Sequence, residues 1–134
     1  MGSTRVKYLI DSNIWIYAAS GIEPAIDVLD EASRGEWAGF SAICRLEVLG
    51  YPDLTVSDEQ KLCELLECFR EVEIGRSVID RAIALRRTQR IKVPDAIVAG
   101  TALLMGASLI TRNSSDFTAV KGLNVINPFE AKPS

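Results

Sequence analysis

Four acidic side chains of this 134-residue chain lie at predicted strand-to-helix turns or near predicted helix starts: Asp11, Glu47, Asp95 and Asp116. Asp11 directly follows the strand-like run 6–10. Asp95 falls in the first turn of an apolar helix that we expect to begin at Pro94. Because the carboxyl ends of parallel strands meet at one edge of a sheet, where ligands of open α/β sheets bind, we expect these carboxylates to converge.

A cluster of carboxylates with no histidine points to metal chemistry. The chain contains no histidine, so catalytic triads and dyads that depend on this residue are excluded. Oxygen ligands suit Mg²⁺ or Mn²⁺ better than Zn²⁺. Such a cation would cancel the repulsion between the carboxylates, lower the pKa of a bound water and stabilise a pentavalent phosphate.

Each acidic residue, taken singly, also has a structural explanation. Asp11 could be a turn residue or a helix N-cap, and Asp95 could cap its helix or pair with an arginine. Glu47 could be an ordinary solvated glutamate inside a helix over 42–49. The chemical hypothesis therefore depends on the set of residues and on the fold that would bring them together.

Predicted strands and helices alternate along the chain. The strands are expected over 6–10, 37–40, 71–74, 108–111 and 123–126. The helices are expected from 14, over 24–34 and 42–49, after a capping box at 57–60, over 77–90, and from 94 to the stop at Gly106. This order predicts a three-layer α/β/α sandwich with a mainly parallel central sheet, formed by a single domain over 1–134.

The composition limits the partners. The net charge of −3 is unfavourable for binding nucleic acid over the whole surface, so RNA contacts would need a local basic patch. The run from Arg76 to Lys92 holds six cations, offset only by Asp80. It is either a solvated helix face or a stripe that contacts phosphates. No apolar run approaches the ~18 residues of a membrane span and no signal-peptide pattern is present, so we expect a cytoplasmic protein without a membrane partner.

Four short segments in order resemble PIN-domain ribonucleases, most closely the VapC-type toxins of bacterial and archaeal toxin–antitoxin pairs. The segments are YLIDSN at 8–13, SAICRLEV at 41–48, PDAIVA at 94–99 and LITRNSSDF at 109–117. The closing VINPF at 125–129 also resembles the end of such domains. The resemblance covers essentially the whole chain.

The resemblance implies roles for particular residues. Asp11, Glu47, Asp95 and Asp116 would be the four catalytic acids. Asp11, Asp95 and Asp116 would hold Mg²⁺ or Mn²⁺, and Glu47 would complete the shell or orient the attacking water. The side chains that would orient the carboxylates are Ser12, Asn13, Thr111 and Asn113. Asn113 competes with Asp116 for the fourth place. The family implies hydrolysis of RNA phosphodiester bonds, a homodimer, and inhibition by a cognate antitoxin.

Other functions fit less of the sequence. A phosphotransferase with Asp11 as nucleophile would usually carry a second aspartate where Asn13 stands. A receiver-like signalling domain would share only Asp11 and Thr111. The main alternative is a catalytically inactive PIN-like module that binds RNA or protein. Stability in EDTA separates it from a metal enzyme, because a purely structural cluster should be insensitive to metal.

Overall fold

The computed structural model describes residues 6–130 and contains a five-stranded sheet in the order β3-β2-β1-β4-β5. Every neighbouring pair of strands is parallel. The strands are β1 (Lys7–Ile10), β2 (Trp37–Ser41), β3 (Arg70–Val72), β4 (Ser108–Ile110) and β5 (Val125–Ile126). The expected domain over 1–134 includes residues 1–5 and 131–134, which lie outside the described residues.

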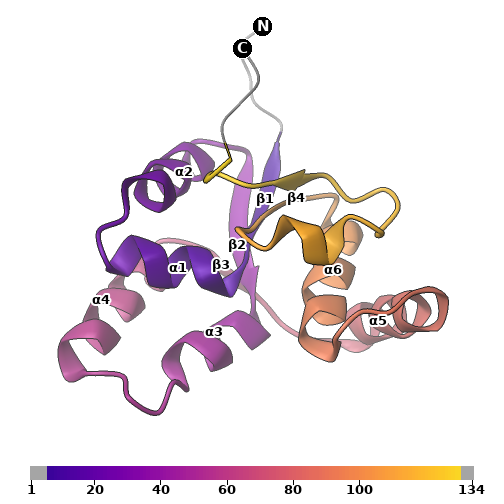
Figure 1. Ribbon diagram of the computed structural model, residues 1–134, viewed down its shortest axis with the longest axis horizontal. Helices are drawn as coiled ribbons and strands as arrows, with labels where there is room; N and C mark the ends of the chain where they lie inside the picture. The colour runs from indigo at the N-terminus through magenta and orange to yellow at the C-terminus, as the bar shows by residue number, and fades with distance from the viewer. Residues whose placement is uncertain (1–5, 131–134) are drawn as a thin grey trace, which may run out of the picture.

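Helices cover both faces of the sheet. They are α1 (Ser12–Ala19), α2 (Glu23–Ser33), α3 (Ala42–Leu49), α4 (Val56–Glu67), α5 (Arg76–Thr88) and α6 (Val93–Met105), with a short 3₁₀ helix η1 (Ser114–Phe117). Figure 1 shows α1 and α2 on one side of the sheet and α5 and α6 on the other. The predicted three-layer α/β/α sandwich with a parallel sheet is therefore confirmed.

Helix α6 is the buried helix that the sequence predicts. Its residues 96–102 are all buried, and the helix packs on β1, β2 and β4. It ends at Gly106, whose φ of 66° is in the left-handed region that glycine adopts without strain. It begins at Val93, one residue before the expected Pro94. Because α6 leads directly into β4 and packs on the parallel sheet, its N-terminus lies at the carboxyl edge of the strands.

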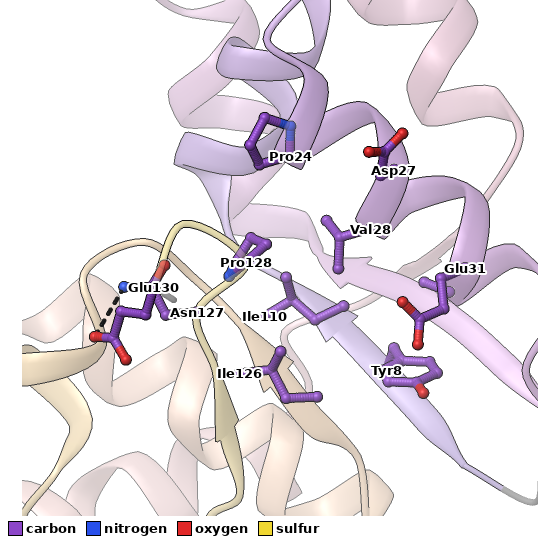
Figure 2. A pocket seen from close by; sticks show the side chains of 11 residues that line it. Tyr8, Pro24, Asp27, Val28, Glu31, Ile110, Ile126, Asn127, Pro128 and Glu130 are labelled. Atoms are coloured by element: carbon purple, nitrogen blue, oxygen red, sulfur yellow. Dashed lines mark hydrogen bonds between the residues drawn. The ribbon is translucent and has the colours of Figure 1, made fainter. Parts of the chain in front are cut away.

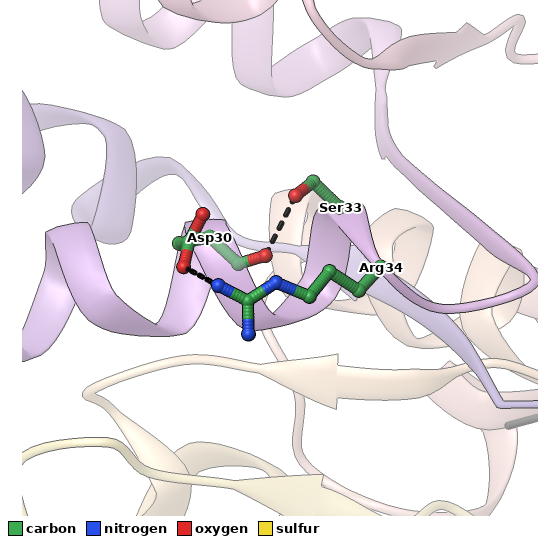
Figure 3. Close-up of polar contacts among 3 residues, drawn as sticks. All are labelled: Asp30, Ser33 and Arg34. Carbon is green, nitrogen blue, oxygen red and sulfur yellow. Dashed lines mark hydrogen bonds and ion pairs between the residues drawn. The ribbon is translucent and has the colours of Figure 1, made fainter. Parts of the chain in front are cut away.

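Local polar contacts lie at the end of α2 and at the start of α4. At the end of α2, the Ser33 hydroxyl donates to the Asp30 carbonyl at 2.6 Å, and Arg34 pairs with the Asp30 carboxylate (Figure 3). Helix α4 is capped by Thr55, which accepts a hydrogen bond from the Asp58 N–H at 3.1 Å. The predicted cap at Ser57 is wrong because a threonine two residues earlier satisfies the free N–H groups of the first turn.

An aromatic cluster fixes α1 against the sheet. Trp15 is fully buried, and its ring meets Phe40 at 5.5 Å and Phe69 at 5.0 Å between centroids, both in edge-on geometry. Its indole N–H donates to the Ile10 carbonyl at 3.4 Å. Since Ile10 ends β1 and Trp15 lies in the first turns of α1, this cluster holds the β1–α1 turn that contains Asp11.

Gly39 on strand β2 is the site of a stability test. A Cβ atom added there would lie 2.4 Å from the Arg70 carbonyl oxygen and 2.5 Å from the Trp37 ring. The strand carbonyl cannot move without breaking the sheet, so Gly39→Ala should lower the free energy of unfolding by about 1–3 kcal/mol. Urea unfolding measures it. The control is Gly75→Ser, which adds a side chain where nothing lies within 4 Å and should be neutral or stabilising. Equal stability of Gly39→Ala and wild type would contradict the expectation.

Candidate active site

Asp11 is a buried carboxylate at the junction of two strands. Only 7% of it is exposed, and its N–H donates to the Ile110 carbonyl at 2.9 Å, which joins the ends of β1 and β4. Its Oδ1 accepts from the Ser12 N–H at 2.8 Å as the N-cap of α1. Its Oδ2 accepts from the Thr111 hydroxyl at 2.8 Å and from the Asn13 amide at 3.4 Å. The structural role considered for Asp11 is thus real, and it coexists with a position in the acidic cluster.

Asn13 and Thr111 connect the loop after β1 to the loop after β4. Asn13 donates to the Thr111 hydroxyl at 3.3 Å and accepts from the Arg112 N–H at 3.0 Å. The Asn113 N–H donates to the same hydroxyl at 3.1 Å. These bonds orient Asp11 from both sides, as expected for Asn13 and Thr111, whereas Asn113 contributes through its main chain.

Glu47 reaches the cluster through Ser12. The Ser12 hydroxyl donates to Glu47 Oε1 at 2.7 Å, across 35 residues of sequence. Glu47 is exposed on α3, a helix that begins directly after β2 with Ser41 as its N-cap. Because β2 is the neighbour of β1 in the sheet, α3 starts beside α1 and brings this carboxylate to the same edge.

Asp95 neither caps its helix nor forms an ion pair with any described residue. It is half-buried in the first turn of α6, whose N-cap is Lys92 without a side-chain capping bond. Burial raises the pKa of Asp95 to about 6, and the charges of Asp11, Asp116 and Glu47 contribute to this rise against the opposing effect of Lys92. A carboxylate in this environment is held at an electrostatic cost.

Asp11 experiences the same neighbours. Burial raises the pKa of Asp11, the hydrogen bonds from Thr111 and Ser12 lower it, and the charges of Glu47 and Asp116 raise it. Asp116 itself is exposed on η1. The four predicted acids therefore act on one another electrostatically at one edge of the sheet. Asn113, the competitor of Asp116, is exposed and carries no charge that would contribute to this field.

The cluster suits a divalent cation in its chemistry and charge. Its donors are carboxylate and other oxygens. A bound cation would offset the burial and the mutual repulsion that together raise the pKa values of Asp11 and Asp95. Within residues 6–130, no group of three or more His, Cys, Asp or Glu side chains is already arranged to hold a metal ion. Burial raises the pKa of the neighbouring Cys44 to about 12, so its thiol stays protonated and is a poor ligand.

A cavity of about 480 Å³ lies apart from the acids, between α2 and the β4–β5 side of the sheet (Figure 2). Its walls include Val28, Ile110 and Ile126, and none of the four predicted acids lines it. At its rim, the Asn127 amide donates to Glu130 Oε1 at 3.2 Å. The same amide donates to the Arg112 carbonyl at 3.0 Å, so the C-terminal turn braces the loop after β4. The sequence offered one signal for this brace, the closing run at 125–129, but no role was predicted for it.

The family model for the PIN domain matches residues 8–123, and the chain belongs to the PIN-domain family. A toxin–antitoxin complex from Klebsiella pneumoniae contains a chain with 33% identity and a TM-score of 0.78, covering 92% of this chain and 99% of that one. The resemblance to PIN domains of the VapC type is thereby confirmed. No curated protein sequence matches the chain.

Two more distant structures show the same fold. A chain of VapBC2 from Rickettsia felis, bound to a DNA fragment from its promoter, has 19% identity and a TM-score of 0.80, covering 91% of this chain and 98% of that one. A chain of FitAcB from Neisseria gonorrhoeae has 22% identity and a TM-score of 0.75, with 92% and 99% covered. In the part of the chain that the structure describes, no helix has the length and apolar character needed to cross a membrane.

The raised pKa of Asp95 predicts a pH-dependent effect of Asp95→Asn on the metal-free protein. The folded pKa of about 6 lies above the ordinary 3.8, so the folded state binds more protons between these values and its stability falls as pH rises through this window. The Asn variant lacks this titration. Its Tm should therefore exceed that of wild type by an amount that is smallest below about pH 4 and levels off above about pH 6–7.

Thermal melting in EDTA across this pH range measures the difference. Asp95→Asn is a cleaner test than Asp11→Asn, because Asp11 accepts three hydrogen bonds that an amide would partly lose. The control is Glu59→Gln, which removes an exposed acid on α4, outside the acidic cluster, and shows the effect of losing one surface charge. A lower Tm for Asp95→Asn at every pH would mean that Asp95 stabilises the fold.

Proposed function

We propose that the protein is a Mg²⁺- or Mn²⁺-dependent endoribonuclease that acts as the toxin of a toxin–antitoxin pair. The observation that carries the proposal is the mutual electrostatic influence of Asp11, Asp95, Asp116 and Glu47 at the carboxyl edge of a PIN-domain sheet. In a purely structural cluster, repulsion between carboxylates would only destabilise the fold. In a metal-binding cluster, the bound cation would offset this repulsion.

In the proposed mechanism, each residue has a separate task. Asp11, Asp95 and Asp116 would hold the metal, which would lower the pKa of a bound water and stabilise charge on the phosphate. Thr111 and Asn13 keep Asp11 in one orientation through hydrogen bonds to its Oδ2. Glu47, held by the Ser12 hydroxyl, would orient the attacking water or accept its proton.

The toxin role draws support from the Klebsiella pneumoniae relative, which comes from a toxin–antitoxin complex. We propose a cognate antitoxin as partner and the cytoplasm, where RNA is made and translated, as the compartment.

A second cavity, of about 310 Å³, lies between α1, α3 and α4, with Ile16, Val48 and Tyr51 in its lining. Ile16 and Tyr51 are exposed apolar side chains, as is Leu46 on α3. Such surfaces suit an antitoxin segment or the second subunit of the proposed homodimer.

Removal of one site carboxylate should abolish RNA cleavage. With Asp11→Asn or Asp95→Asn, metal binding weakens and the water is misplaced, so the rate with Mg²⁺ or Mn²⁺ should fall on the order of 10³-fold or more. Cleavage of a single-stranded or loop-containing RNA measures it, with Glu59→Gln as the control of equal charge change. Unaltered cleavage by purified Asp95→Asn would sink the proposal. A wild-type protein that binds RNA without cleaving it, and that melts identically with metal or EDTA, would favour the inactive binding module.

The basic run is a further part of the proposal. Most of it lies on α5, which packs closely against α6 beside Gly100. Arg86 donates to the Ile91 carbonyl at 2.6 Å and so helps to hold the loop before α6. Arg87 and Arg90 are exposed and form no ion pair with any described residue, which leaves them suitable for RNA phosphates or for acidic residues of an antitoxin.

The double variant Arg87→Gln, Arg90→Gln tests this surface and leaves Arg86 intact. The slope of log affinity against log salt should fall by roughly 0.7 for every phosphate of a single-stranded RNA that the variant no longer binds. RNA binding over a salt series measures the slope, and metal affinity should stay nearly unchanged. Lys61→Gln on α4 is the single-charge control. An unchanged slope in the double variant would mean that the run is a solvated face or serves only the antitoxin.

A further inference from the structure

Arg112, in the loop that follows β4, lies against two aromatic rings. Its guanidinium carbon is 4.9 Å from the centroid of the Tyr17 ring and 4.4 Å from that of Phe129. The two rings are 5.1 Å apart and inclined at 60°, so the three side chains form a triangle. Cation–π contacts of this length hold a guanidinium in place through its face and leave its N–H edge available.

The main chain of Arg112 is held as firmly as its side chain. Its N–H donates to Asn13 Oδ1 at 3.0 Å, and its carbonyl accepts from the Asn127 amide at 3.0 Å. The Phe129 N–H in turn donates to Asn127 Oδ1 at 2.9 Å, which places the Phe129 ring on the guanidinium. The loop after β4, the first turn of α1 and the C-terminal turn therefore all contribute to the position of this one cation.

The N–H groups of the Arg112 guanidinium have no hydrogen-bond acceptor among residues 6–130. The side chain is exposed, and it forms no ion pair with any described residue. Arg112 directly follows Thr111, whose hydroxyl holds Asp11. A pre-positioned cation with free planar donors, on the residue that follows the threonine bound to Asp11, is suited to bidentate binding of a phosphate.

We propose that Arg112 binds a backbone phosphate of the RNA next to the one that is cleaved, and that Tyr17 and Phe129 are its positioning residues. The inference rests on the proposed function. Carboxylates repel RNA, so a strand entering the site needs a cation within one nucleotide or so of the reacting phosphate. Tyr17 lies one helical turn beyond Asn13 on α1, so the Arg112 guanidinium that contacts its ring lies over α1. In this proposal the RNA strand therefore crosses the start of α1.

The test compares Arg112→Gln, Arg112→Lys and the control Lys61→Gln in the full chain. RNA affinity is measured over a salt series in the Asp95→Asn background, and KM and kcat are measured in the active background. Arg112→Gln should weaken RNA binding roughly tenfold, lower the salt slope by roughly 0.7, and raise KM more than it lowers kcat. Arg112→Lys should retain the slope but recover only part of the affinity, because a lysine cannot form the planar fork.

The outcomes separate this inference from the proposed function. A wild-type protein that fails to cleave RNA overturns the proposed function, whereas cleavage with equal KM and salt slope for Arg112→Gln and Lys61→Gln overturns the role of Arg112. If Arg112→Gln lowers Tm and kcat but leaves the salt slope unchanged, the binding of phosphate by Arg112 is also overturned. Arg112 would then only stabilise the C-terminal turn. Loss of antitoxin binding without loss of RNA binding would assign the cation to the antitoxin instead.

The variant Phe129→Leu tests the positioning of Arg112 by the rings, because it retains the charge of Arg112 and an apolar contact. It should raise KM a few-fold with the salt slope intact, and an unchanged KM would overturn the positioning by the rings.

Discussion

The structure of the site depends on one buried carboxylate, that of Asp11, at the point where β1 and β4 end side by side. A buried charge of this kind is tolerated only when hydrogen-bond donors surround it. The first N–H of α1 and the side chains of Asn13 and Thr111 supply these donors. Because Thr111 and Asn13 also bond to each other and to the Arg112–Asn113 main chain, the stabilisation of one charge sets the geometry of two loops.

The remaining carboxylates add repulsion to this arrangement. Asp95 is held half-buried by a helix whose residues 96–102 pack into the core, so it cannot move away from Asp11 without disturbing that core. Glu47 is held through Ser12. The fold therefore maintains a local concentration of negative charge that is unfavourable in isolation, and the metal ion that we propose for this site would offset it.

Cations on the surface answer a second requirement of the proposed reaction, since a polyanionic substrate must approach an acidic site. Two supplies differ in their construction. The arginines of α5 are exposed side chains on one helix, suited to steering by charge. Arg112 is fixed by aromatic rings and by main-chain bonds at both of its peptide groups. This construction suits a cation that holds an RNA strand in one position. A chain with a net charge of −3 can combine these functions because short-range contacts are governed by local charge.

The sequence by itself determined the α/β/α class and most strand and helix positions, because these depend on patterns over a few neighbouring residues. The catalytic role of the four acids stays a prediction from the sequence. Competition between neighbouring residues changed only the ends of elements. For example, the N-cap of α4 is Thr55 and not the predicted Ser57. The tertiary structure alone decided which side chains meet. The bonds of Thr111 to Asn13 and Asp11 span 98 and 100 residues and exist because β4 is the sheet neighbour of β1. The triangle of Arg112, Tyr17 and Phe129 likewise joins three segments that no periodicity connects, since side-chain contacts between distant segments follow from strand order and packing.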